Sequence, residues 1–161
     1  MSSRTVLVIG ATGYIGGSVL SAYLRRFPQY SFSALVRNPK DVGAIEALGV
    51  KTIVGSGEDH ALVKKLALEY DVVVNAADAD DLPLAKSIID GLTERSNADK
   101  SRTKPIYIHT RYKIQLYSSK VTLIYVGFGS GSGVVVSPEA DGALHPPLTD
   151  KIYDVRFTMK E

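Results

Sequence analysis

Residues 6–17 read VLVIGATGYIGG, and this stretch decides the fold of the chain. Its apolar start, Val6 to Ile9, is typical of a buried strand and stops at Gly10, after which glycines recur at Gly13 and Gly16. Apolar side chains then follow at helical spacing, at Ile15, Val19, Leu20, Tyr23 and Leu24. The stretch therefore predicts a strand, a tight glycine turn and the start of a helix.

The glycine turn has the composition of a phosphate-binding loop. A residue without Cβ lets the backbone approach a pyrophosphate closely, and the N–H groups of a helix's first turn point at such an anion. The alternative is that the glycines only close a turn between strand and helix. The regular alternation of strands and helices that follows favours the phosphate-binding interpretation.

The bulk composition excludes several classes of protein. At 161 residues the chain holds one domain, or one domain and a remnant. Its net charge is only +2, and positive and negative residues are interspersed, which argues against nucleic acid or a membrane surface as the main partner. It has no cysteine, and no apolar run reaches the roughly 18 residues of a membrane span. The N-terminus leads straight into a strand without a signal-peptide pattern, so we expect a cytoplasmic protein.

Five strands alternate with helices as far as residue 110. The predicted strands are residues 6–9, 31–36, 50–54, 72–75 and 106–109, and the predicted helices begin after Gly13, Asn38, Asp59 and Asp81. The strands are apolar throughout, as expected when helices cover both faces of a sheet. This pattern predicts an α/β doubly wound parallel sheet with the strand order 3-2-1-4-5.

Ligands of such sheets bind at the carboxyl ends of the strands, beside the switch point between the first and fourth strands. The glycine loop, Arg37, Ala76-Ala77 and His109-Thr110 are all expected at this edge.

Four motifs resemble those of atypical and extended short-chain dehydrogenases/reductases. That group includes the NAD-dependent epimerase/dehydratases and the NmrA-like proteins. GATGYIG at 10–16 resembles their cofactor loop, and LVRNP at 35–39 resembles the end of the second NmrA-like strand. NAA at 75–77 and IYIHT at 106–110 resemble the ends of their fourth and fifth strands. The resemblance covers residues 4–110 and implies the NAD(P)-binding half of a Rossmann-type fold.

The resemblance also implies roles for individual residues. Gly10, Gly13 and Gly16 would approach the pyrophosphate, Thr12, Tyr14 and Ile15 would line the loop through backbone groups, and Ala76 and Ala77 would pass near the nicotinamide ribose. Arg37 bears on the choice of cofactor, because NAD specificity usually needs an acidic residue at the end of the second strand. A guanidinium there suits a 2′-phosphate, so we predict NADP(H) over NAD(H). The alternative is that Arg37 is a surface charge at a strand end.

No catalytic residue is identified in the sequence. Enzymes of this group carry a Tyr-x-x-x-Lys pair, in which the Tyr works as general acid/base. The chain has no such pair, and Tyr117 with Lys120 is one residue short. His109 is interpreted as a strand-end side chain. The acidic residues 78, 80 and 81 are interpreted as capping and loop residues, and no metal site is predicted.

The region from residue 111 onward departs from the family pattern. We divide the chain into an NAD(P)-binding half at 1–110, an irregular or hairpin insert with a Gly/Ser link at 111–133, and a truncated remnant at 134–161. One hypothesis is that 111–130 is a retained intron, because Arg111-Tyr112 can be encoded AG|GTAC and Ser130 AG|C. Residues 155–161 would be read into a second intron. The alternative is a genuine hairpin that pairs 114–117 with 121–126.

These observations predict the cofactor half of an oxidoreductase or epimerase-like protein. Its hydride transfer would act on a small alcohol or aldehyde metabolite. Two alternatives stay open, namely a non-catalytic NADP-sensing regulator of the NmrA type and an inactive truncated product. The lack of a Tyr-x-x-x-Lys pair favours the regulator slightly.

Overall fold

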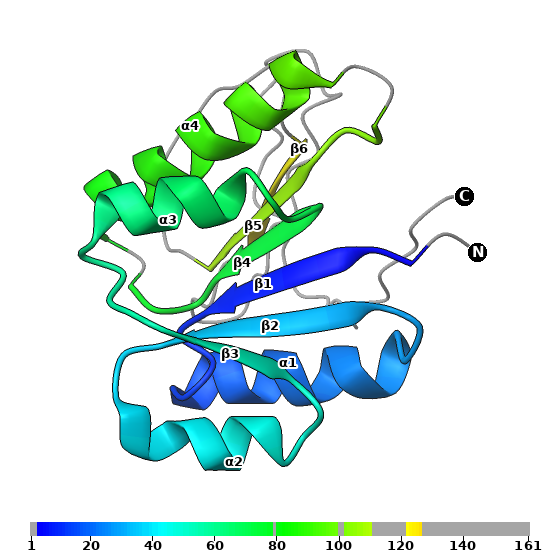
Figure 1. The fold of residues 1–161 in the computed structure, drawn as a ribbon, viewed down its shortest axis with the longest axis vertical. Helices are drawn as coiled ribbons and strands as arrows, with labels where there is room; N and C mark the ends of the chain where they lie inside the picture. The colour runs from blue at the N-terminus through cyan, green and yellow to red at the C-terminus, as the bar shows by residue number, and fades with distance from the viewer. Residues whose placement is uncertain (1–2, 79, 100–101, 111–121, 127–161) are drawn as a thin grey trace, which may run out of the picture.

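A six-stranded parallel sheet is the centre of the computed structural model (Figure 1). The structure describes residues 3–78, 80–99, 102–110 and 122–126. The strands are β1 (Thr5–Ile9), β2 (Ser31–Val36), β3 (Lys51–Val54), β4 (Val72–Asn75), β5 (Ile106–Thr110) and β6 (Thr122–Val126). The helices are α1 (Tyr14–Arg26), α2 (Val42–Glu46), α3 (His60–Ala67) and α4 (Leu82–Ala98), with a 3-10 helix at Pro39–Asp41.

The strand order is β3-β2-β1-β4-β5-β6, and every neighbouring pair is parallel. The predicted α/β doubly wound sheet with the order 3-2-1-4-5 is therefore confirmed, and a sixth strand extends it. β6 pairs with β5 from Ile106 opposite Thr122 to Thr110 opposite Val126. β5 is thus an inner strand, with hydrogen-bonding partners on both sides.

Within the insert predicted at 111–133, only β6 belongs to the described residues. It lies within the stretch 121–126 that the sequence marks as strand-like. The hairpin partner predicted at 114–117, the Gly/Ser link up to 133 and the remnant at 134–161 lie outside the described residues.

Two helical layers cover the sheet, with α1 and α2 on one face and α3 and α4 on the other (Figure 1). Alternate residues of each strand point to opposite layers. Leu7, Val73 and Tyr107 pack with Val63, Leu66, Leu84 and Ile88 of α3 and α4. Val8, Val74 and Ile108 pack with Leu20, Tyr23 and Ile45 of α1 and α2. Burial of all these side chains explains why the strands read as continuous apolar runs.

The helix starts agree with the predicted caps. Asn38, Asp59 and Asp81 accept hydrogen bonds from the backbone N–H groups of Lys40, Leu62 and Leu84 at 3.1, 3.0 and 2.8 Å. Each side chain thereby satisfies one of the donors that a helix start leaves open. Within the described ranges, no helix is both long and apolar enough to cross a bilayer.

Gly91 lets α3 and α4 approach each other closely. A Cβ at this position would lie 2.5 Å from the carbonyl oxygen of Lys64 and 2.7 Å from Cβ of Ala67. Lys64 also forms an ion pair of 2.9 Å with Glu94 across the same two helices. Sequence alone does not reveal this close approach, because the residues that Gly91 faces, Lys64 and Ala67, lie 24 or more residues away in the chain.

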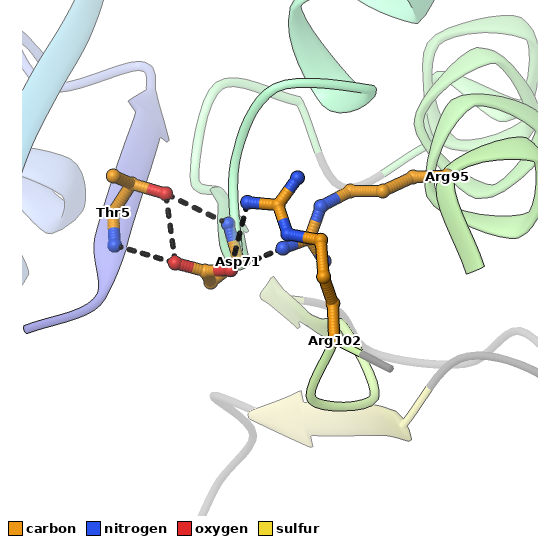
Figure 2. Close-up of polar contacts among 4 residues, drawn as sticks. All are labelled: Thr5, Asp71, Arg95 and Arg102. Carbon is orange, nitrogen blue, oxygen red and sulfur yellow. Dashed lines mark hydrogen bonds and ion pairs between the residues drawn. The ribbon is translucent and has the colours of Figure 1, made fainter. Parts of the chain in front are cut away.

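A polar cluster ties the amino ends of β1 and β4 to α4 (Figure 2). It consists of Thr5, Asp71, Arg95 and Arg102, and we call it the amino-edge cluster. The Asp71 carboxylate accepts from the N–H and the hydroxyl of Thr5, both at 2.9 Å, and forms an ion pair with Arg95. Arg102 lies 3.7 Å from the same carboxylate. Arg95 is only 3% exposed, so this pair is shielded from water.

Candidate functional site

The carboxyl ends of four strands lie in register at one edge of the sheet. Leu35 of β2, Ile9 of β1, Asn75 of β4 and His109 of β5 are aligned side by side. The segments that follow these residues therefore leave the sheet together. They are the segments that the sequence analysis placed at this edge, namely the glycine loop, Arg37, Ala76-Ala77 and Thr110.

The glycine loop rests directly on the turn that follows β4. Gly10 has a φ of +86°, which favours glycine, and a Cβ there would lie 2.5 Å from the N atom of Ala77. The same Cβ would lie 2.6 Å from the carbonyl carbon of Ala76. Any side chain at this position would thus push the loop away from the Ala76-Ala77 turn.

The other two glycines close the turn into α1. The N–H of Gly13 donates to the carbonyl oxygen of Gly10 at 3.0 Å. A Cβ on Gly16 would lie 2.0 Å from that same oxygen, so the first turn of α1 passes directly over Gly10. The structure therefore brings Gly10, Gly13 and Gly16 together with Ala76 and Ala77, as the sequence analysis expected.

The start of α1 differs from the starts of α3 and α4. Its N-cap is Gly13, with extended backbone, and no described side chain caps it or places an acidic group in its first turn. Thr12, Tyr14 and Ile15 are exposed around it, and Tyr14 is 93% exposed. Because a helix start carries partial positive charge and open N–H donors, this end of α1 suits an anion.

Arg37 is exposed and follows β2 directly. Leu35, two residues earlier, is paired with Ile9, the last residue before the glycine loop, so the backbone at Arg37 leaves the sheet at the same edge as that loop. The next residue, Asn38, caps the following turn and does not supply an acidic group. A cationic residue therefore follows β2 at the edge of the sheet where the glycine loop leads into α1.

A buried polar network lies beneath the Ala76-Ala77 turn. Asn75 is fully buried, and its Oδ1 accepts from the N–H of Ala77 at 3.2 Å. Its Nδ2 lies 3.4 Å from the Tyr107 hydroxyl and 3.3 Å from Nδ1 of His109, and the hydroxyl and that Nδ1 are 3.0 Å apart. Thr110 donates through its hydroxyl to the carbonyl oxygen of Asn75 at 3.1 Å.

His109 lies next to the last residue of β5, in keeping with its interpretation as a strand-end side chain, but its place in this buried network was not predicted. His109 is 1% exposed, and β5 continues to Thr110. The network could have been found from the sequence: His109 and Tyr107 are two residues apart and share one face of the strand, the face on which Asn75 of the neighbouring strand lies.

The acidic residues after β4 have local structural roles. The carboxylate of Asp78 accepts from the N–H of Asp80 at 2.8 Å, and Asp81 caps α4. Their interpretation as loop and capping residues is confirmed for these contacts. Within the described part of the chain, no three His, Cys, Asp or Glu side chains form a group that could hold a metal ion.

Known proteins share this arrangement. The model of the NmrA-like family matches residues 2–94, which is more than half of the chain. The chain belongs to the NmrA-like family. Among curated proteins it is similar to the oxidase ucsJ of Acremonium sp, with 33% identity over 95 residues, which are 58% of this chain and 27% of that protein. The resemblance seen in the sequence is thus confirmed for its NmrA-like part.

Two solved reductase structures share the fold of this NmrA-like chain. AtPrR2 with NADP+ and (+)pinoresinol matches with a TM-score of 0.52 and 23% identity, over 68% of this chain and 36% of that one. Leucoanthocyanidin reductase of Vitis vinifera with NADPH matches with a TM-score of 0.51 and 22% identity, over 65% and 35%. The chain thus shares the fold of these reductases, and it spans about a third of their length and about a quarter of ucsJ.

Proposed function

We propose that residues 3–110 bind a dinucleotide, with NADP(H) preferred over NAD(H). The observation that carries this proposal is the contact of Gly10 with the Ala76-Ala77 turn beneath an uncapped start of α1. A loop without side chains, open N–H groups and a helix start are the parts that hold a pyrophosphate. Gly10, Gly13 and Gly16 would supply the close approach of the backbone.

The remaining predicted residues extend the dinucleotide along the edge of the sheet. Thr12, Tyr14 and Ile15 would contact it through backbone groups of the loop. Ala76 and Ala77 would lie near the nicotinamide ribose, because the β4 turn lies on the β5 side of the loop. Arg37, on the β2 side, would bind the 2′-phosphate of NADP at the adenosine end.

The relatives support this type of cofactor. The two reductases named above were solved with NADP+ and with NADPH. Their sequences are 22–23% identical to this chain, so the choice of NADP here depends on Arg37 and not on them.

For the whole protein we propose a hydride exchange at an alcohol or aldehyde carbon of a small metabolite, in an oxidoreductase or an epimerase-like protein. A non-catalytic NADP-sensing regulator is the second candidate, favoured by the lack of a Tyr-x-x-x-Lys pair in the sequence. NADPH oxidation measured against a panel of small aldehydes separates the two. Turnover supports the enzyme, and tight binding without turnover supports the regulator.

The binding proposal is tested by fluorescence titration with NADPH and NADH. We expect Arg37→Ser to weaken NADPH binding by about tenfold or more and to leave NADH binding unchanged, because only NADPH carries the 2′-phosphate. Arg26→Ser removes the same charge in the last turn of α1 and is the matched control. Tighter binding of NADH than of NADPH by the unchanged chain would refute the preference.

The loop itself is tested by Gly10→Ala, with Gly49→Ala as its control. Both glycines have positive φ, at +86° and +79°, so both substitutions strain the backbone. Only Gly10 faces backbone atoms within 4 Å, whereas a Cβ at Gly49 would meet nothing. We expect NADPH binding to disappear in Gly10→Ala and to persist in Gly49→Ala, and equal affinities would contradict the proposed site.

A further inference from the structure

The buried network beneath the Ala76-Ala77 turn has a fixed direction of hydrogen bonding. The N–H of Ala77 can only donate, so Asn75 turns its Oδ1 toward Ala77 and its Nδ2 toward β5. Nδ2 also carries only hydrogens, and it lies 3.3 Å from Nδ1 of His109. A proton on Nδ1 would face this donor, so we assign Nδ1 as an acceptor, with its one lone pair directed at the Tyr107 hydroxyl and the proton of the neutral imidazole on Nε2.

Tyr107 fits between these two groups. Its hydroxyl lies 3.4 Å from Nδ2 of Asn75, from which it accepts, and 3.0 Å from Nδ1 of His109, to which it donates. All three side chains are at most 1% exposed. Water therefore cannot replace a missing member, and loss of one removes a hydrogen bond that orients the next side chain.

This chain of bonds ends at the turn on which the glycine loop rests. Asn75 is the last residue of β4, and its side chain closes a turn with the N–H two residues later. Gly10 contacts that same N atom so closely that a Cβ would come within 2.5 Å. Both the buried network and the glycine loop therefore contact the Ala77 N atom, so a shift of one affects the other.

We propose that His109, acting through Tyr107 and Asn75, is a positioning residue for the dinucleotide site. The proposal rests on the proposed binding of a dinucleotide to the glycine loop. His109 does not reach the ligand in this account. Its acceptor nitrogen orients the Tyr107 hydroxyl, and this hydroxyl orients the Asn75 amide. The amide in turn holds the Ala76-Ala77 turn in the position on which the glycine loop rests.

The first test is Tyr107→Phe, with Ile88→Val as the matched control. The first variant removes one hydroxyl, and the second removes one methylene from a fully buried α4 side chain in the same core cluster. Both are expected to lower stability to a similar extent. We expect Tyr107→Phe to bind NADPH roughly 3- to 10-fold more weakly and Ile88→Val to stay within about twofold of the unchanged chain. Circular dichroism at the titration temperature confirms that each variant is folded.

The second test uses two substitutions of His109. The side-chain oxygen of His109→Gln can accept from the Tyr107 hydroxyl, whereas His109→Leu offers no acceptor. A positioning role predicts that His109→Gln recovers most of the NADPH affinity lost in His109→Leu. Equal affinities in the two variants would mean that only packing matters and would overturn the inference.

NMR provides a readout that does not need a ligand. In the unchanged chain we expect the ring nitrogens of His109 to show the tautomer with the proton on Nε2. Hydrogen exchange of the Ala77 amide should be several-fold faster in Tyr107→Phe than in Ile88→Val. The opposite tautomer, or equal exchange rates, would overturn the inference even where NADPH binds. If the unchanged chain fails to bind NADPH, the proposed function fails, and the exchange rates still decide whether the network positions the turn.

Discussion

Asp71→Asn should strongly destabilise the chain, because it removes the only carboxylate of the amino-edge cluster (Figure 2). Arg95 is 3% exposed and would lose its ion-pair partner, although the charge of Asp99 still acts on it. An asparagine that keeps its oxygen on the Thr5 donors would turn its NH2 group toward the guanidinium groups, so donor would face donor. Removing one partner of a buried ion pair typically costs about 3–5 kcal/mol.

That magnitude is a large part of the 5–15 kcal/mol by which domains are usually stable. Glu94→Gln is the matched control, because it neutralises an α4 carboxylate that pairs with Lys64 at the surface. The side chains of Lys64 and Glu94 are 46% and 56% exposed. An exposed pair contributes about 0–1 kcal/mol. Urea unfolding at pH 7, followed by circular dichroism, measures both variants. A loss below about 1 kcal/mol in Asp71→Asn, or equal losses in the two, would refute the reasoning.

The same carboxylate predicts how stability depends on pH. Burial by itself would raise the pKa of Asp71, but the hydrogen bonds of Thr5 and the charges of Arg95 and Arg102 outweigh it and hold the pKa below its ordinary value. Burial in turn lowers the pKa of Arg95. Since the unfolded chain binds a proton to this carboxyl more readily, the stabilisation is complete above the unfolded pKa near 4 and disappears as pH falls through the lower native pKa. This acid-dependent loss should be smaller in Asp71→Asn, and unfolding curves between pH 5 and 2 test it.

Four further substitutions test other contacts. Gly91→Ala should destabilise the chain by about 1–3 kcal/mol, because its Cβ would meet Lys64. Gly43→Ala, where nothing lies within 4 Å, should stabilise it by up to about 1 kcal/mol, and thermal unfolding compares the two variants. Asp81→Ala should cost about 1 kcal/mol in urea unfolding through loss of the α4 cap. Gly13→Asp should change stability by only a few tenths of a kcal/mol, yet abolish NADPH binding in a fluorescence titration, because a carboxylate would occupy the start of α1. Unaltered NADPH affinity there would contradict an anion site.

The parts of the fold that could be predicted have local signals. The bounds of β2 and β4 match the prediction, since an apolar run ends there at a charged or turn residue. The caps at Asp59 and Asp81 are equally local. The end of α3 at Ala67 has a weaker local signal, because apolar residues continue at Leu68 and Tyr70, beyond the end of the helix.

Contacts between distant segments gave weaker signals. The strand-like stretch at 121–126 is confirmed in β6, but its parallel pairing with β5 was not foreseen, because pairing is decided by segments that sequence order does not connect. Arg95 follows Ile88 and Leu92 at helical spacing, so it lies on the buried stripe of α4. A charge on such a stripe requires a partner, and that pattern could have led to Asp71.

The two edges of the sheet differ in whether their polar groups have partners within the chain. At the amino edge, the Asp71 carboxylate accepts hydrogen bonds from Thr5 and pairs with Arg95 and Arg102, so its charge is balanced by groups of the chain itself. At the carboxyl edge, α3 and α4 begin with aspartate caps, whereas α1, which begins beside the switch point between β1 and β4, begins with a glycine and no capping side chain among the described residues. Stability alone would favour a cap at all three helices, because a cap contributes about 1 kcal/mol. α2 also has no side-chain cap of its own, but it directly continues the 3-10 helix that Asn38 caps. The exception falls on the helix that a bound phosphate would cap instead, so the missing cap and the close approach of Gly10 to Ala77 point to the same ligand.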